Sequence, residues 1–541
     1  MSTAPHEAPS PSLELERIAS SGALGERGYL DPSARLSLVA SVSPPGAAAA
    51  GAHGSSSSGS GPHAETSAAS SQTSQRRTGP RQEEKKGPAS MSAAASPEDD
   101  VSKPPAAAER GNSQPPKRSR GVRERILNFT PSWFSVSMGT GGVHILLLLL
   151  GDVWAPYSSD YTTSPHASNT AALTLPTRIL RWFALPVLLV NICIFTTFIA
   201  AFTSRYIMFP AVLPLTLKHP QKSVFIGTLP MALLTIVSTV SQIGTRAFDL
   251  GLWPTLLAVS LWFLAVVLSL ACAVVIPYMM MIHQRHLLEG TTASLLLPVV
   301  PPITAAATGA GLVEILTRSH PSLAFTVLTI SYICNGVGLM LALMILVLYF
   351  QRLLLFHQPA REVIISVFLP LGPCGQGAEA LLHLGQASLY LFPTISTLPG
   401  SGVPQLSFPV GQALYGAGLI GALHLVGLGC WFMFLAVAIV IREQSQGKLP
   451  FSLGWWAATF PLASLLIGIG RCAMVLDSLT LRIIFTILCG AYGVIYFSVA
   501  IPTARGFITG HLLVAPCLAD LPLDPLRKYR DPREDYDEAK A

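Results

Sequence analysis

Charged residues are scarce in this chain of 541 residues: they make up 12% of it, whereas 50% of the residues are hydrophobic. Apolar runs of about 20 residues recur too often for the core of a soluble protein, so the composition indicates an integral membrane protein. We predict an all-α fold with ten transmembrane helices, at roughly 131–150, 180–203, 223–241, 255–281, 297–316, 322–349, 361–384, 412–441, 453–476 and 480–501.

Paired cysteines and nucleotide-binding motifs are missing. The eight cysteines are spread singly and form no CxxC pair, so neither a disulfide framework nor a zinc site is indicated. No GxxxxGK[ST] motif is present, so nucleotide hydrolysis is not expected to drive the protein. We therefore expect no cofactor, no metal and no enzymatic activity.

Aromatic residues are almost absent from residues 1–120, which are rich in Ser, Ala, Gly and Pro. Such a segment cannot bury enough apolar surface to offset its chain entropy, so we expect a disordered cytoplasmic tail. The first apolar run follows only after about 130 residues, so the first span itself would act as the targeting signal. Residues 125–505 then form one transport domain, and 506–541 a short cytoplasmic tail.

Positive charges are unevenly placed along the chain, whose formal net charge is +6. With ten spans, both termini share a side. That side carries Lys117, Arg118, Arg120, Arg123, Arg125, Arg205, Lys218, Lys222, Arg285, Arg352, Arg361, Arg442, Lys448 and Arg505. The opposite loops carry mainly Arg178, Arg246 and Arg318. The positive-inside rule therefore predicts that both termini are cytoplasmic, and the basic balance needs no nucleic-acid partner.

Prolines fall in alternate spans. The third, fifth, seventh and ninth spans contain Pro230, Pro301 with Pro302, Pro370 with Pro373, and Pro461, whereas the sixth, eighth and tenth have no interior proline. Proline bends a helix and frees a carbonyl group, which in lipid needs protein or water as a partner. We predict five helical hairpins, in which kinked odd-numbered helices line a central pore and straight even-numbered helices face lipid.

Several ordered motifs on these spans resemble a known family. They are NFTPSWF at 128–134, MGTGG at 138–142, GTLPM at 227–231, LPLGPCGQG at 369–377 and WWAATFPL at 455–462. Together they resemble the tellurite-resistance/dicarboxylate transporter family, which includes the plant slow anion channels, and within it they are most similar to the fungal sulfite efflux pumps. The similarity covers roughly residues 125–505.

The resemblance implies a ten-helix fold of five hairpins and a homotrimer with one pore in each subunit. It also implies that a phenylalanine on the ninth helix plugs the pore, a role that carries over to Phe460, next to Pro461. A ring at this position can close a narrow pore by steric block and dewetting. The alternative is ordinary packing, because aromatic side chains are normal in membrane spans.

Small and hydroxyl-bearing residues dominate the candidate pore lining, which contains no Lys or Arg. The candidates are Ser137, Thr140, Thr228, Pro230, Thr308, Gly375, Gln376 and Pro461, with Ser135 and Thr304 as further members. Their dipoles would stabilise an anion weakly enough to release it. The alternative is that these residues serve close helix packing and interhelical hydrogen bonds.

Five ionisable residues fall in the outer half of odd-numbered spans: His144, Glu314, Glu379, His383 and Arg471. Such residues are costly in lipid and normally face a cavity or a partner, so we expect them around an outer vestibule. Glu379 and His383 are four residues apart and share a helix face. For Glu314 and Arg471 the alternative is that they lie at span ends and reach the interface. One Glu and one His supply too few ligands for a metal site.

These features favour a plasma-membrane anion transporter that exports sulfite or bisulfite. The nearest alternative is a malate or C4-dicarboxylate permease of the same family. Two other classes stay open: an intramembrane enzyme using Glu379 with His383, and a receptor or scaffold that uses the long tail. The expected partners are small anions, the lipid bilayer and further copies of the chain.

Overall fold

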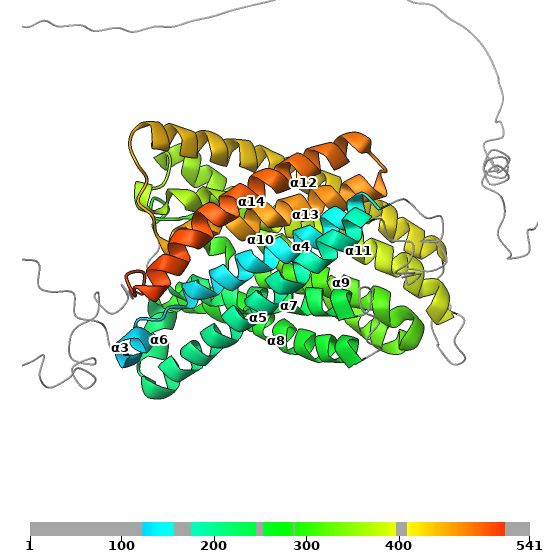
Figure 1. Ribbon diagram of the computed structural model, residues 1–541, viewed down its shortest axis with the longest axis horizontal. Coiled ribbons are helices and arrows are strands. Elements are labelled where there is room, and N and C mark those ends of the chain that lie inside the picture. Colours follow the sequence, from blue (N-terminus) through cyan, green and yellow to red (C-terminus); the bar gives the residue numbers. More distant parts are fainter. Residues whose placement is uncertain (1–121, 156–174, 245–252, 285–286, 397–407, 514–541) are drawn as a thin grey trace, which may run out of the picture. The chain divides into compact units, whose positions relative to one another are not determined.

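Ten helices in the described part of the chain are long and apolar enough to cross a membrane, as the sequence predicts (Figure 1). The computed structural model describes residues 122–155, 175–244, 253–284, 287–396 and 408–513. These residues all belong to one unit, Gly111–Ala541. The predicted tail, 1–120, lies outside the described residues, as does the C-terminal segment beyond 513. The described residues contain helices and no strand.

The ten helices fall into two groups that alternate along the chain. The odd-numbered spans contain α4 (Phe134–Val153), α7 (Thr228–Gln242), α9 (Val300–Ser319), α11 (Leu371–Ser396) and α13 (Thr459–Val475). The even-numbered spans are α5 (Leu175–Met208), α8 (Trp253–His283), α10 (Pro321–Phe356), α12 (Phe408–Ser445) and α14 (Leu479–Ile508). In the apolar stretch of each span, 78–89% of residues are buried in the odd-numbered group and 17–44% in the even-numbered group. We call the two groups inner and outer helices.

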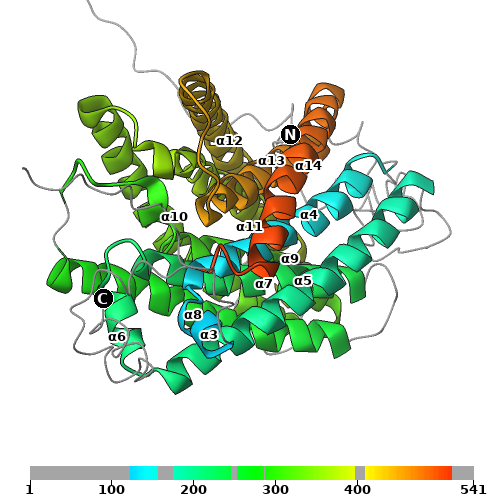
Figure 2. The same ribbon diagram turned by 60° about the vertical axis from the view of Figure 1, so that its left-hand side comes forward.

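The inner helices form a closed ring. Each packs against the next in the order α4, α7, α9, α11, α13 and back to α4, and each also packs against the outer helix that follows it in the chain (Figure 2). Small residues allow this close approach. A side chain at Gly375 would collide with the backbone of Ser464 and Leu465 on the neighbouring inner helix. We call this arrangement the inner ring.

Three prolines of the inner helices, Pro230, Pro373 and Pro461, lie where a 3-10 segment gives way to an α-helix, whereas Pro393 lies inside α11. Each inner helix is preceded by a short 3-10 segment: η1 (Pro131–Trp133), η3 (Ser223–Gly227), η5 (Ala293–Leu296), η6 (Arg361–Phe368) and η7 (Leu453–Ala458). Pro230, Pro373 and Pro461 each lie in the first turn of the α-helix that follows. Proline is tolerated there because its missing N–H group has no intrahelical partner to lose. The expected mid-span kinks are thus changes of helix type.

Proline does not distinguish the inner helices from the outer ones as the sequence suggested. Pro186 lies inside α5, Pro277 inside α8 and Pro502 inside α14. The expectation that the tenth span lacks an interior proline is wrong, because α14 continues to Ile508, beyond the predicted end at 501. The helix α14 thus ends three residues after the predicted domain boundary at residue 505.

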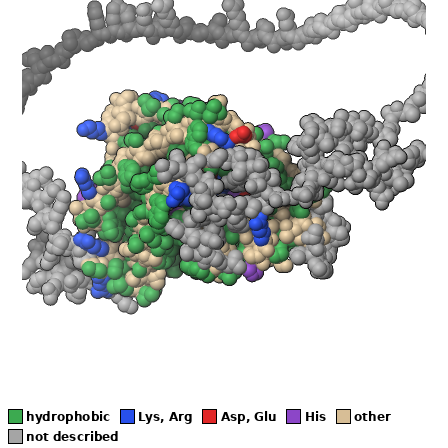
Figure 3. Space-filling model, turned by 45° about the vertical axis from the view of Figure 1, so that its right-hand side comes forward, with side chains coloured by type: hydrophobic (Ala, Val, Ile, Leu, Met, Phe, Trp, Pro, Cys, Tyr) green, Lys and Arg blue, Asp and Glu red, His purple; other side chains and the backbone are tan. Residues whose placement is uncertain are grey.

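The two ends of the helix bundle differ in chemistry. At the end where the inner helices begin, short elements α3 (Val122–Leu127) and α6 (Val212–Lys218) pack near Arg205, whose Nε donates to the Leu127 carbonyl at 3.0 Å. We call this the basic end. Figure 3 shows Lys and Arg side chains along the edge of the basic end, and hydrophobic side chains spread over the helices next to it. Apolar outer faces of this kind suit contact with lipid.

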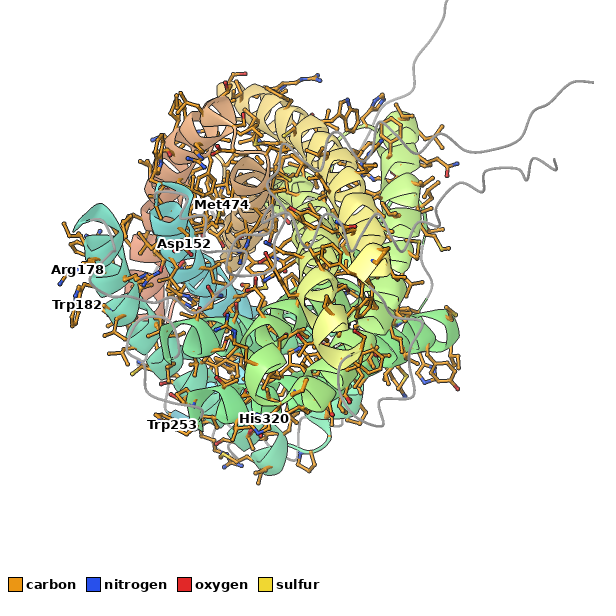
Figure 4. The ribbon with its side chains drawn as sticks, turned by 90° about the vertical axis from the view of Figure 1, so that its right-hand side faces the viewer. Asp152, Arg178, Trp182, Trp253, His320 and Met474 are labelled. Carbon is orange, nitrogen blue, oxygen red and sulfur yellow. The ribbon has the colours of Figure 1, made fainter. Side chains whose placement is uncertain are left out.

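Exposed tryptophans mark the opposite end. Trp182 on α5 is 62% exposed and Trp253 on α8 is 60% exposed, each in the first turns of an outer helix. Figure 4 looks toward this end: both tryptophans and Arg178 lie at its periphery, while Asp152 and Met474, in the last turns of α4 and α13, lie nearer the middle. Exposed tryptophans at one end of a bundle of membrane-spanning helices are typical of a membrane–water interface.

Candidate functional site

The contacts of α13 determine which of its residues face the middle of the inner ring. Gly375 of α11 lies against the backbone of Ser464, and Gly142 of α4 lies against Ala463. A helix turns 100° per residue, since 3.6 residues make one turn. Residues 460, 467 and 471 point between the sides occupied by α4 and α11. Phe460, Ile467 and Arg471 therefore face the middle of the ring, with Ser464 at its edge.

The same spacing recurs on two neighbouring inner helices. On α11 the stripe is Gly372, Gln376, Glu379 and His383, and on α9 it is Thr304, Thr308, Gly311 and Ile315. The stripes of α11 and α13 are joined by Gln376 Nε2, which donates to Ser464 Oγ at 3.2 Å. The stripes of α9 and α11 meet at Gly311, where an added Cβ would lie 3.4 Å from His383 Cε1. The three stripes thus run side by side around the middle of the ring.

On α4 the corresponding face is apolar. Gly141 lies against Thr235 of α7 and Gly142 lies against Ala463 of α13, so Met138 and Ile145 point between these two neighbours. Gly139 lies against Thr459, which places Met138 at the level of Phe460. Sequence reasoning missed Met138, Ile145, Ser464 and Ile467. For Ser464 a signal existed, because it lies one turn after Phe460.

Phe460 is 2% exposed and lies in the first turn of α13. Several aromatic rings in the described residues gather in clusters, for example Phe129, Trp133, Phe134 and Phe198 near the basic end. Among the described aromatic pairs, none includes Phe460. Gly372 of α11 lies against Pro461, the next residue, with room for a methyl group: a Cβ there would meet only Pro461, at 3.9 Å.

Four of the five predicted ionisable residues come together on three inner helices. His383 Nε2 lies 3.4 Å from Glu314 Oε2, and Gln376 Nε2 donates to Glu379 Oε2 at 3.4 Å. Both Arg471 and His383 lie close enough to Glu379 for their charges to act on it. We call Glu314, Glu379, His383 and Arg471 the charge cluster. Arg471 lies eleven residues after Phe460, which on an α-helix is about 16 Å.

His144 lies elsewhere. It is fully buried between α4, α5 and α7, where its Nδ1 contacts Thr239 Oγ1 at 2.7 Å and its Nε2 lies 3.4 Å from Asn191 Nδ2. Asn191 Oδ1 also accepts a hydrogen bond from Ser137 Oγ at 2.8 Å. This chain of contacts joins the first hairpin to the second, and the structure does not bring His144 to the charge cluster.

The predicted lining residues divide into three sets. Thr140 Oγ1 contacts Tyr496 of α14 at 3.1 Å, and Thr228 Oγ1 donates to the Pro131 carbonyl at 3.1 Å. Ser137 and Gly375 likewise touch neighbouring elements, and these contacts favour the packing interpretation. Pro230 and Pro461 lie in the first turns of α7 and α13. Gln376 and Thr308 lie on the stripes, and Thr308 makes no side-chain hydrogen bond to any described residue.

The buried Asn191 contacts yield a stability prediction. Asn191→Ala removes the partner of Ser137 Oγ and of His144 Nε2, while His144 Nδ1 keeps its contact with Thr239. In the membrane interior, interhelical hydrogen bonds contribute about 0.6 kcal/mol each on average. We expect a loss of about 1–2 kcal/mol, measured as a lower thermal unfolding temperature of the purified protein in detergent.

Thr196→Val is the control for this change. Thr196 is exposed on the same helix, and its Oγ1 bonds only to carbonyls of its own turn, at 2.9 Å to Ile192. The variant should keep the wild-type unfolding temperature. An equal temperature for Asn191→Ala and wild type would show that the buried contacts do not stabilise the hairpin pair.

Comparison with known proteins assigns the family. The voltage-dependent anion channel family (SLAC1) matches residues 128–504. The sulfite efflux pump SSU1 of Arthroderma otae is 34% identical over 338 residues, which cover 62% of this chain and 80% of the pump. A putative malic acid transport protein of Schizosaccharomyces pombe is 24% identical over 406 residues, covering 73% of this chain and 84% of that protein. The chain therefore belongs to the voltage-dependent anion channel family and is an anion transporter, not an enzyme.

Proposed function

We propose that the protein exports sulfite or bisulfite across the plasma membrane, that anions pass along the middle of the inner ring, and that Phe460 closes this passage. The observation that carries the proposal is the order of groups along the three stripes. An aromatic ring near the basic end is followed by hydroxyl and amide groups, Thr304, Thr308, Gln376 and Ser464, and then by the charge cluster. Neutral dipoles bind an anion weakly enough for it to move on.

Helix ends add to the attraction for anions. Three inner helices begin near the level of Phe460: α13 at Thr459, α11 at Leu371, and α4 at Phe134, about one turn before Met138. The N-terminal end of a helix carries partial positive charge that favours a nearby anion. Such fields attract an anion without the strong binding that a fixed cation at the level of Phe460 would cause.

The direction of transport follows from the membrane potential. A potential of 100 mV, negative inside, favours the exit of one negative charge by about 2.3 kcal/mol. Export therefore requires no nucleotide. We place both chain termini, and with them the tail 1–120 and the segment after α14, in the cytoplasm, because the loops at the basic end hold most of the Lys and Arg residues.

We also propose that the protein works as a homotrimer with one passage in each subunit. Each inner ring is closed within one chain, so each copy has its own passage. The outer helices have large apolar faces, for example around Phe434 and Val494, which are 72% and 73% exposed. Cross-linking of the purified protein should give a species of three chains.

A flux assay tests the function. The purified chain is reconstituted into liposomes, and sulfite, malate, nitrate and chloride are offered in turn under a set potential, with protein-free liposomes as the control. We expect sulfite flux well above the control and little competition from malate. The relatives named for malic acid transport make a dicarboxylate permease the second candidate. Malate flux without sulfite flux would replace the first proposal with the second.

A further inference from the structure

The charge cluster holds buried polar atoms that have no hydrogen-bond partner in the described structure. His383 is 5% exposed, and neither of its ring nitrogens makes a hydrogen bond. Its Nε2 lies 3.4 Å from Glu314 Oε2, which is close enough for an ion pair but lacks hydrogen-bond geometry. Arg471 Nε is also buried without a partner. Leaving such groups unpaired is costly, so they point to a ligand that binds among them.

The cluster offers both donors and acceptors to such a ligand. Arg471 donates, His383 can donate from either ring nitrogen, and Gln376 supplies an amide. The carboxylates of Glu379 and Glu314 accept. Two potential cations beside two carboxylates do not fit a simple anion trap, because the acidic groups would repel a fully deprotonated oxyanion.

Other charged groups on the surrounding helices lie outside the cluster. On α9, Arg318 lies one turn beyond Glu314 and is exposed, and on α12 His424 is exposed and contacts the Ile420 carbonyl of its own helix. On α10 and α12, Arg352 and Glu443 lie at the basic end. Glu379 is therefore faced by Arg471 from α13 and by His383 from its own helix, and His383 in turn is faced by Glu314 from α9.

We propose that the charge cluster binds an oxyanion that carries one acidic proton, and that Glu379 determines this specificity by accepting the hydrogen bond from the acid O–H group. Arg471 and His383 bind the other oxygens. Among sulfur(IV) species, the site takes singly charged bisulfite and rejects the sulfite dianion. This inference rests on the proposed function, since it names the species of anion that passes the same ring.

The test compares the full-length wild type with Glu379→Gln in liposomes. Flux is measured at a series of pH values spanning the deprotonation of bisulfite, with nitrate as a permanent monoanion and sulfate as a permanent dianion. For the wild type we expect sulfur(IV) flux to fall with the bisulfite fraction, about tenfold per pH unit at the alkaline end, and sulfate to be excluded. Glu379→Gln should flatten this fall and raise the flux of sulfate relative to nitrate at least several-fold.

Two further variants complete the experiment. Glu362→Gln, an exposed carboxyl at the basic end, is the matched control and should reproduce the wild-type pH profile. Arg471→Gln removes the positive charge and leaves the acceptor Glu379, so it should lower sulfur(IV) flux at every pH without flattening the profile. It also supplies the test should Glu379→Gln not fold.

Two results would overturn the inference in different ways. If Glu379→Gln keeps both the wild-type pH profile and the exclusion of sulfate, or if Arg471→Gln leaves sulfur(IV) flux unchanged, the specificity does not reside in this cluster. If the wild type moves no sulfur(IV) species at any pH while it conducts nitrate, the proposed function itself fails.

Discussion

Gly375→Ala should abolish or strongly reduce the yield of folded protein. The added methyl group would overlap the Ser464 carbonyl and the Leu465 amide nitrogen. These are backbone atoms of a buried inner helix and cannot turn away as a flexible side chain could. Overpacking of a core costs about 1–3 kcal/mol where neighbours can adjust, and more where they cannot. We expect a loss of at least about 3 kcal/mol, seen as a large drop in unfolding temperature or in the monodisperse fraction on size-exclusion chromatography.

Gly372→Ala is the matched control on the same helix. It adds the same methyl group one turn earlier, where the nearest atom is Pro461 Cβ at 3.9 Å, an ordinary van der Waals distance. This variant should fold with the wild-type yield. Equal yields of the two variants would show that α11 and α13 do not approach each other as closely as the structure indicates.

Most of the fold could be predicted from the sequence because the membrane restricts what a hydrophobic segment can do. In lipid every backbone polar group must be satisfied internally, so each apolar run of sufficient length becomes a helix. The division into inner and outer helices was also predictable, since small residues such as Gly139 and Gly375 permit close packing around a common axis. The alternation of prolines was a partly misleading signal of this division, because Pro186, Pro277 and Pro502 lie inside outer helices.

The candidate site was harder to predict because residue type does not tell which way a helix faces. Ser137, Thr140, Thr304 and Thr308 have the same chemistry on inner helices. Ser137 and Thr140 bond to the outer helices α5 and α14, whereas Thr308 lies on a stripe that faces the middle of the ring. Rotation is determined by packing with neighbours, which a single sequence does not record.

The charge cluster was partly within reach of sequence reasoning. Glu379 and His383 are four residues apart and share a helix face, so their proximity can be predicted from local sequence. That Glu314 belongs with them, and that His144 does not, depends on contacts between helices far apart in the sequence. His144 and Glu314 are both single ionisable residues in apolar spans, so nothing in their local sequence separates a residue that joins two hairpins from one at the middle of the ring.

Phe460→Ala should raise anion flux by at least about tenfold, equivalent to lowering the barrier by about 1.4 kcal/mol. The ring projects toward the middle of the inner ring at the level of Met138. Removing it widens an apolar constriction and admits water, which lowers the cost of bringing in a hydrated anion. Currents across a planar bilayer, carried by nitrate or sulfite and normalised to the amount of reconstituted protein, measure the effect.

Phe485→Ala separates gating from packing. Phe485 of α14 is as buried as Phe460, but it lies against Gly470 on a different side of α13. Its removal should create a cavity in packed protein and cost about 3–5 kcal/mol, with no gain in flux. Phe460→Ala should lose less stability, because a ring that closes a passage leaves a space that water can fill, and it alone should conduct faster. If both variants lose stability equally and neither conducts faster, Phe460 is a packing residue and the passage lies elsewhere.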